Sequence, residues 1–204
     1  MQTSATNSPR PFLILASASP RRQEILRAAG IDFEVMPADL PEIPLAAETP
    51  EAFVCRMAEA KAHVVLARQP SLRFPILAAD TVVVLGNSIL GKPSSPEDAR
   101  RMLRELSGNL HTVLTAVCLL CPPDQHTDSA YEVSKDIRVA STEVKFLPMT
   151  QQEIEDYVAT GEPLDKAGAY AIQGFASKYI AWIHGDYFNV VGLPISLVWQ
   201  MLKR

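Results

Sequence analysis

A short apolar run that passes directly into an amphipathic helical pattern limits the fold of this chain more than any other feature. Residues 12–16 (FLILA) are typical of a buried strand. Ser19 and Pro20 suit the N-cap and the first position of a helix, and Gly30 suits its end. We therefore expect a strand at residues 12–16 that is followed at once by a helix.

Strand and helix patterns alternate along the rest of the chain. Further strands are predicted within residues 33–38, 74–93, 111–120, 131–146 and 178–185. Further helices are predicted to begin near Thr49, Ser95, Thr150 and Pro194. This interleaving predicts an α/β fold with a mixed sheet. We expect one domain at residues 11–204, preceded by a loose tail at residues 1–10.

The overall composition narrows the class of protein. The chain has 204 residues, three cysteines and a net charge of −4. The acidic balance argues against a nonspecific nucleic-acid binder, which would carry a basic excess. No stretch is apolar enough for a membrane span, and residues 1–10 lack the apolar core of a signal peptide. An odd number of cysteines suits a reducing compartment, so we expect a cytoplasmic protein. The charge and the hydropathy together predict neither nucleic-acid nor membrane partners.

Cys118 and Cys121 form a C-x-x-C pattern inside an apolar stretch that is predicted to be a strand. Residues three apart on a strand point to opposite faces, which does not suit a shared metal or a redox pair. No second cysteine pair completes a zinc site. Both residues are therefore interpreted as structural thiols.

The adjacent arginines Arg21 and Arg22 stand where the first strand gives way to its helix. At this point free backbone N–H groups, the positive helix end and two guanidinium groups converge, an arrangement that suits a phosphate. The alternative is that both arginines are solvated residues of the first turn, where their charge opposes the helix dipole. Under the phosphate-site interpretation, removal of Arg22 is expected to change stability little, whereas a large loss of stability would favour the alternative.

Asp80 interrupts an otherwise apolar strand pattern (PILAADTVVVL). A buried carboxylate must be paired, bound to a metal or functional, and the structural alternative is a salt bridge to a lysine or arginine. Lys61 lies near the edge of an apolar helical stripe, and Lys92 follows a predicted hairpin. Each lysine alone suits the surface, but two or three cations near Arg21 would form a triphosphate cradle.

The segment at residues 162–174 (EPLDKAGAYAIQG) is dense in glycine and charge. Gln173 is predicted at a loop tip, where its amide offers both a donor and an acceptor to a base edge. The alternative is an amide that only satisfies the loop backbone. Further along, Asn189 and Gly192 are predicted to shape a turn at the end of the sheet.

These stretches together resemble the Maf family, relatives of a septum-formation inhibitor that are nucleoside triphosphate pyrophosphatases. The resemblance runs from Leu13 to about Leu202 and rests on LASASPRR, EAKA, AADTVV, GKP, LSG, EPLDKAGAYAIQG and NVVGLP, in the family's order. It implies a mixed, elongated sheet flanked by helices, with two lobes and a cleft, similar to the inosine triphosphate pyrophosphatases. Members often form homodimers.

The resemblance also assigns roles to single residues. Asp80 matches the family's catalytic aspartate, and Glu42 with Asp80 matches a site for a divalent cation, Mg or Mn. The residues that match the family's phosphate-handling positions are Ser17, Arg21, Arg22, Lys61 and Lys92. Arg21, Thr81 and Gln173 match the branch that acts on dTTP and UTP. Ala171 and Gly91 depart from that branch, which usually has glycine and glutamate there.

The resemblance implies hydrolysis of dTTP and UTP to the monophosphate and pyrophosphate, by attack of water on the α-phosphorus. Modified pyrimidine nucleotides are further candidate substrates. One alternative is a nucleotide-binding regulator of septum formation that acts through protein contacts. A second is an RNA-binding module that uses Arg21 and Arg22, although the acidic composition speaks against it.

Overall fold

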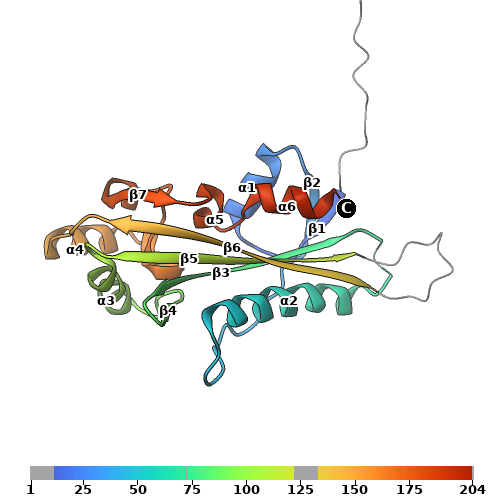
Figure 1. Cartoon of the computed structure of the whole chain (residues 1–204), viewed down its shortest axis with the longest axis horizontal. Helices are drawn as coiled ribbons and strands as arrows, with labels where there is room; N and C mark the ends of the chain where they lie inside the picture. Colours follow the sequence, from blue (N-terminus) through green and yellow to red (C-terminus); the bar gives the residue numbers. More distant parts are fainter. Residues whose placement is uncertain (1–11, 72, 122–132, 204) are drawn as a thin grey trace, which may run out of the picture.

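The computed structural model describes residues 12–71, 73–121 and 133–203 and contains one long mixed sheet (Figure 1). Its described strands run in the order β2-β1-β3-β5-β6-β7, and β4 pairs with β3. The strands are β1 (Phe12–Leu15), β2 (Asp32–Val35), β3 (Ile76–Leu85), β4 (Ser88–Leu90), β5 (Leu110–Cys121), β6 (Ser134–Phe146) and β7 (Ile180–His184). β1 pairs in parallel with β2 and β3, whereas the remaining pairs are antiparallel. The predicted α/β class and mixed sheet are confirmed.

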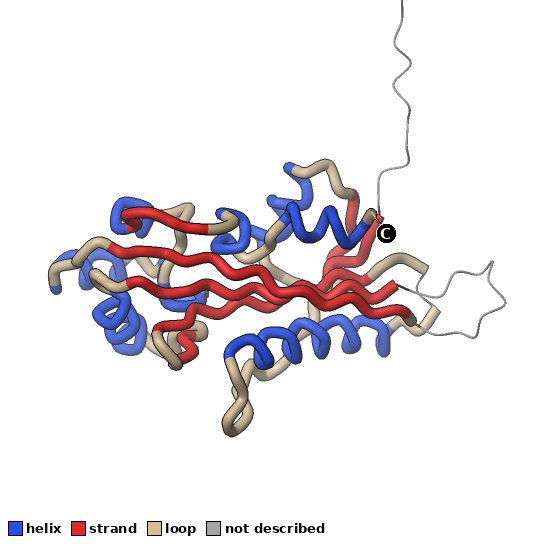
Figure 2. The backbone as a smooth tube through the Cα atoms, viewed as in Figure 1, coloured by secondary structure: helices blue, strands red, loops and turns tan. Residues whose placement is uncertain are grey.

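Helices cover both faces of the sheet (Figure 2). They are α1 (Pro20–Ala28), α2 (Pro50–Arg68), α3 (Pro96–Leu106), α4 (Gln151–Ala159), α5 (Tyr187–Val191) and α6 (Ile195–Leu202). Three short 3-10 helices lie within and just after the segment at residues 162–174: η1 (Glu162–Asp165), η2 (Ala167–Ala169) and η3 (Phe175–Tyr179). α2 packs under one face of the sheet, α1 and α6 lie over the other, and α3 and α4 cover the far end (Figure 1).

The core follows the twofold alternation of strand side chains. On β3, Ala78 enters the hydrophobic cluster beneath α2, whereas Leu77 and Ala79 enter the cluster beneath α1 and α6. A third cluster contains Val83 and joins the far part of β3 to α3 and α4. The sheet therefore carries two apolar layers at one end and a separate apolar cluster at the other, in line with the predicted two lobes.

The two cysteines of β5 lie on opposite faces, as the strand spacing predicts. Cys118 packs in the cluster beneath α2, and Cys121 packs against the cluster beneath α1 and α6. Both thiols are free. Burial raises the pKa of both, to about 12 for Cys118, so neither is prepared for thiolate chemistry.

Two local expectations need correction. Ser19 occupies the N-cap position of α1, but its side chain makes no capping bond; its backbone N–H instead donates to Ser17 Oγ over 3.2 Å. The predicted turn around Asn189 is the short helix α5, which ends at Gly192 with φ of 118°. The N-cap hydroxyls of Thr49, Ser95 and Thr150 do cap their helices.

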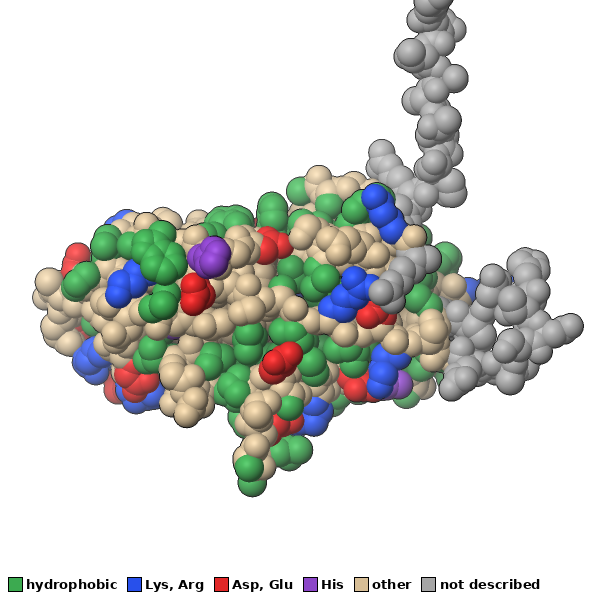
Figure 3. Space-filling view, viewed as in Figure 1, with side chains coloured by type: hydrophobic (Ala, Val, Ile, Leu, Met, Phe, Trp, Pro, Cys, Tyr) green, Lys and Arg blue, Asp and Glu red, His purple; other side chains and the backbone are tan. Residues whose placement is uncertain are grey.

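The distribution of charge on the surface agrees with the small net negative charge of the chain. On the face seen in Figure 3, lysine and arginine side chains are interspersed with acidic ones and do not gather into one basic area. No helix within the described ranges is long and apolar enough to span a membrane. The predicted tail at residues 1–10 lies outside the described residues.

Gly168 gives a direct test of how closely η2 packs on the sheet. Its φ is 66°, and an added Cβ would lie 2.7 Å from Val83 Cγ2. We expect Gly168→Ala to lower the free energy of unfolding by about 2–4 kcal/mol, through backbone strain together with overpacking. Urea titration of the purified variant measures this loss.

Gly86→Ala is the matched control, because Gly86 also has a positive φ, of 59°, but has no neighbour within 4 Å of an added Cβ. Its loss should be about 1 kcal/mol, from backbone strain alone. Equal losses in the two variants would contradict the close packing of η2 on β3.

Candidate active site

A cavity of about 380 Å³ lies beyond the carboxyl end of β1, between the first turn of α1 and residues 165–173. It brings together side chains from both lobes. Apart from Asp80, every residue that the sequence nominated lines it: Ser17, Arg21, Arg22, Glu42, Lys61, Thr81, Lys92 and Gln173. Part of its wall is apolar and contains Val83, Val113, Tyr170, Ile172 and Val190.

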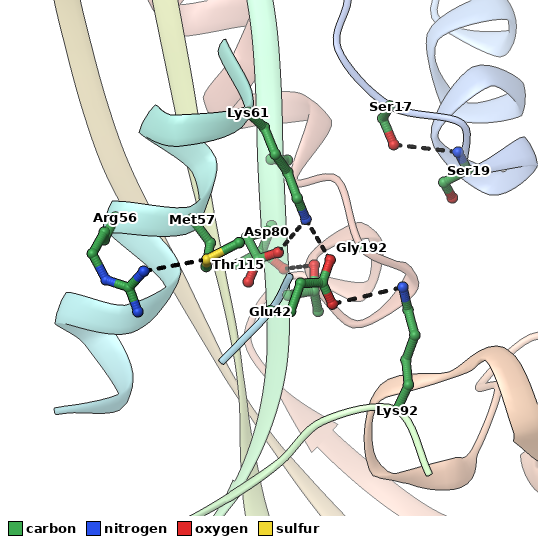
Figure 4. A network of polar contacts seen from close by, with 12 residues as sticks. Ser17, Ser19, Glu42, Arg56, Met57, Lys61, Asp80, Lys92, Thr115 and Gly192 are labelled. Atoms are coloured by element: carbon green, nitrogen blue, oxygen red, sulfur yellow. Dashed lines mark hydrogen bonds and ion pairs between the residues drawn. The ribbon is translucent and has the colours of Figure 1, made fainter. Parts of the chain in front are cut away.

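The Lys61 ammonium is shared by two carboxylates at the centre of the site (Figure 4). Its Nζ lies 2.5 Å from Asp80 Oδ1 and 2.7 Å from Glu42 Oε1. Lys92 Nζ approaches the other side of Glu42, at 3.7 Å from Oε2. Asp80 is only 3% exposed, so the salt-bridge alternative of the sequence analysis describes its immediate environment.

The two carboxylates differ in their affinity for a proton. Burial raises the pKa of Asp80, more than the charge of Lys61 lowers it, and nearby Glu42 adds to the rise. Burial also opposes the charge of Glu42, but Lys61, Lys92 and Arg22 together lower its pKa. Of the pair, Asp80 is therefore the better proton acceptor.

The Arg22 guanidinium is held by the protein itself. Nε donates to the Gly192 carbonyl over 2.8 Å, and Nη1 donates to the Ala79 carbonyl over 2.8 Å and to Ser17 Oγ over 3.1 Å. Nη2 donates to Thr81 Oγ1 over 3.1 Å. These bonds connect α1, β3 and the end of α5. The expectation that loss of Arg22 leaves stability unchanged is therefore wrong, because it would strip buried acceptors of their donor.

Arg21 is the guanidinium of the pair that faces the cavity. Its side chain is 29% exposed, and its closest acidic neighbour in the described residues is Asp165, at 3.9 Å between Nη1 and Oδ2. It makes no hydrogen bond to any residue that the structure describes. Arg21, Lys61 and Lys92 thus present three cations to one cavity beside the start of a helix.

A buried polar chain beneath the site was not predicted. Thr81 Oγ1 lies 2.9 Å from Thr115 Oγ1, which donates to the Asn189 carbonyl over 3.1 Å. Asn189 Nδ2 donates in turn to the Val113 carbonyl and to Thr142 Oγ1. The available signal was the polar residue Thr115 in the middle of an apolar strand. This series of hydrogen bonds fixes Thr81 and the end of α5 relative to the sheet.

Gln173 lines the same cavity from the turn before η3. Its side chain is exposed and has no hydrogen bond within the described part of the chain. The alternative in which the amide satisfies the loop backbone is therefore not seen, and both functions of the amide remain available to a ligand.

The centre holds two carboxylates, the ligand type that a divalent cation prefers. One oxygen of each, Glu42 Oε1 and Asp80 Oδ1, is bonded to the Lys61 ammonium. No cluster of three or more metal-binding side chains occurs in the described ranges. Mg²⁺ commonly takes one or two carboxylates together with substrate phosphates, so these two residues fit an ion of that kind.

Comparisons with known proteins show what the whole chain is similar to. A protein of Koribacter versatilis named dTTP/UTP pyrophosphatase is 47% identical over 192 residues, covering 94% of this chain and 93% of that protein. A protein of the same name from Anaeromyxobacter dehalogenans strain 2CP-1 is 48% identical over 194 residues, covering 95% and 94%. The solved Ham1 protein of Staphylococcus aureus has a TM-score of 0.48 and 13% identity, covering 94% of this chain and 98% of that one.

A family model also matches nearly the whole described chain. The family described as Maf-like protein matches residues 12–204. Together with the identity to full-length relatives, this match settles the family that the sequence motifs suggested. The chain belongs to the Maf family.

Proposed function

We propose that this protein hydrolyses dTTP and UTP to the nucleoside monophosphate and pyrophosphate. The observation that carries the proposal is one cavity that is lined by the three cations Arg21, Lys61 and Lys92 and also by Gln173. The names of the two relatives, at 47% and 48% identity, support the same activity. A triphosphate bound by the cations would leave the base for Gln173.

The three cations of the cavity suit the triphosphate. Arg21 of α1, Lys61 of α2 and Lys92 of the segment between β4 and α3 neutralise the phosphate oxygens and the departing pyrophosphate. The start of α1 adds backbone N–H groups and the positive end of the helix. Arg22 and Ser17 act from behind this surface, since their mutual hydrogen bond holds the turn before α1 in place.

The chemical step needs a group that accepts a proton from water. The oxygen of water forms a bond to the α-phosphorus, and the bond between this phosphorus and the α–β bridging oxygen breaks, which releases pyrophosphate. Asp80 lies behind the lining residue Lys61 and has a raised pKa, so we assign to it the orientation of the water and the acceptance of its proton. A Mg²⁺ or Mn²⁺ ion held by Glu42 and Asp80 would supply charge neutralisation at the phosphate oxygens.

The apolar part of the cavity wall suits a pyrimidine base. Val83, Val113 and Tyr170 belong to this wall, and Gln173 lines the same cavity. Uracil and thymine present an N3–H donor next to an O4 acceptor, and one carboxamide can meet both groups. Cytosine reverses this pattern, so the Gln173 amide would have to turn over to bind it.

A panel of nucleotides tests the activity. The purified protein, with Mg²⁺ or Mn²⁺, should release pyrophosphate from dTTP and UTP with the highest kcat/KM. We expect ATP and GTP to be poorer by at least about tenfold. Adenine reverses the donor and acceptor pattern that Gln173 meets in uracil, and both purines need a wider slot than a pyrimidine does. Failure to release pyrophosphate from any triphosphate would overturn the proposal and favour a regulator that acts through protein contacts.

Gln173→Glu tests the reading of the base. The substitution removes the donor to O4 and places a carboxylate oxygen against it, so kcat/KM for UTP should fall by about tenfold to a hundredfold. Gln200→Glu, an exposed change of the same kind on α6, should leave activity and melting temperature as in the parent. Unchanged UTP hydrolysis by Gln173→Glu, or 7-methyl-GTP as the best substrate of the parent, would contradict this role.

A further inference from the structure

We propose that Tyr157 and Glu162 form a clamp that positions Gln173 and thereby sets the preference for uracil and thymine. The inference rests on the proposed function, in which Gln173 reads the base. It concerns two residues that lie outside the cavity: Glu162 is the first residue of the EPLDKAGAYAIQG segment but was given no role there, and Tyr157 belongs to none of the quoted motifs. Both are positioning residues, because they act through the backbone on either side of Gln173.

The clamp holds the chain two residues before and two residues after Gln173. The Tyr157 hydroxyl donates to Glu162 Oε1 over 2.7 Å and accepts the backbone N–H of Ala171 over 3.1 Å. The Glu162 carboxylate also accepts the backbone N–H of Phe175, at 3.1 Å and 3.2 Å from its two oxygens. One connected set of hydrogen bonds therefore fixes both ends of the Gln173 turn.

The glycine between Gln173 and Phe175 shows how closely the carboxylate approaches the turn. A Cβ added to Gly174 would lie 2.1 Å from Glu162 Oε2, so only glycine leaves room for the carboxylate. The Gly174 N–H donates to the Ala171 carbonyl over 3.1 Å and closes the turn. The backbone is thus restrained while the Gln173 side chain stays free for a ligand.

The direction of the central hydrogen bond is fixed. Tyr157 is 3% exposed on α4, and α4 begins with a complete capping box between Thr150 and Glu153. Burial raises the pKa of Tyr157, and its bond to Glu162 raises it further. The hydroxyl therefore stays protonated, donates a hydrogen bond to Glu162 and accepts a hydrogen bond from the Ala171 N–H.

The restraint of the Gln173 backbone matters more for discrimination between bases than for the rate of the chemical step. An amide distinguishes O4 of uracil from N4 of cytosine only if its two functions stay aligned with the base edge, since hydrogen bonds weaken steeply with angle. Arg21, Lys61 and Asp80 belong to α1, α2 and β3, and the clamp contacts none of these three residues. Loss of the clamp should therefore change KM and substrate preference, with little effect on kcat.

Tyr157→Phe removes one hydroxyl from the clamp and keeps the ring. We expect KM for UTP to rise about fivefold to tenfold, in keeping with the loss of a hydrogen bond. The UTP-to-CTP ratio of kcat/KM should fall by a similar factor, while kcat for UTP stays within about twofold. Tyr179→Phe is the matched control, because Tyr179 is also buried and its hydroxyl makes no hydrogen bond in the described residues.

Glu162 provides a graded second test. Glu162→Ala should lower the UTP-to-CTP ratio at least as much as Tyr157→Phe, whereas Glu162→Gln, which keeps an acceptor of the same shape, should restore most of it. Hydrogen exchange of the nucleotide-free protein should be faster at the Ala171 and Phe175 amides in Tyr157→Phe and Glu162→Ala. This readout is independent of catalysis.

The results separate the clamp from the activity on which it rests. If the parent releases pyrophosphate but Tyr157→Phe keeps the parental KM and UTP-to-CTP ratio, the clamp is overturned. Equal losses of preference in Tyr157→Phe and Tyr179→Phe would overturn it as well, because they would indicate general loosening. A parent without turnover of any triphosphate would overturn the proposed function, and the assignment of base preference to the clamp would fall with it.

Discussion

The site depends on one buried ammonium shared by two carboxylates. Lys61 joins Asp80 of β3 to Glu42 of the segment before α2, over 2.5 Å and 2.7 Å. Burying such charges removes hydration that their attraction barely repays, so an ion pair of this kind adds little net stability. Its value lies in placement, because it holds a cation at the cavity wall and keeps a carboxylate of raised pKa beside it.

The surroundings keep this centre in register with the rest of the cavity. Arg22 ties the turn before α1, the strand β3 and the end of α5 together through four hydrogen bonds. Arg21 next to it remains open to a ligand. Two adjacent residues of the same type therefore differ: the protein itself holds the Arg22 guanidinium, whereas Arg21 lines the cavity without a hydrogen bond to the described residues.

Most helices and strands could be predicted from the sequence, because each has a local signal: an apolar alternation, a capping residue or a glycine at its end. The short helix α5 escaped prediction, since five residues show no helical period. The family motifs nominated the residues of the cavity, but the contacts among them were out of reach. Arg22 and Gly192 are 170 residues apart, and Lys61 and Asp80 are 19 apart on different elements, so no local pattern pairs them.

A double-mutant cycle on Lys61 and Asp80 tests most directly whether this pair exists for catalysis. Lys61→Met should lower the free energy of unfolding by about 3–5 kcal/mol, because Asp80 is left buried without a partner. Combining it with Asp80→Asn should restore most of that stability, while every variant with Asp80→Asn releases pyrophosphate at least about a hundredfold more slowly than the parent. Strictly additive stability losses, or near-parental turnover in Asp80→Asn, would contradict the account.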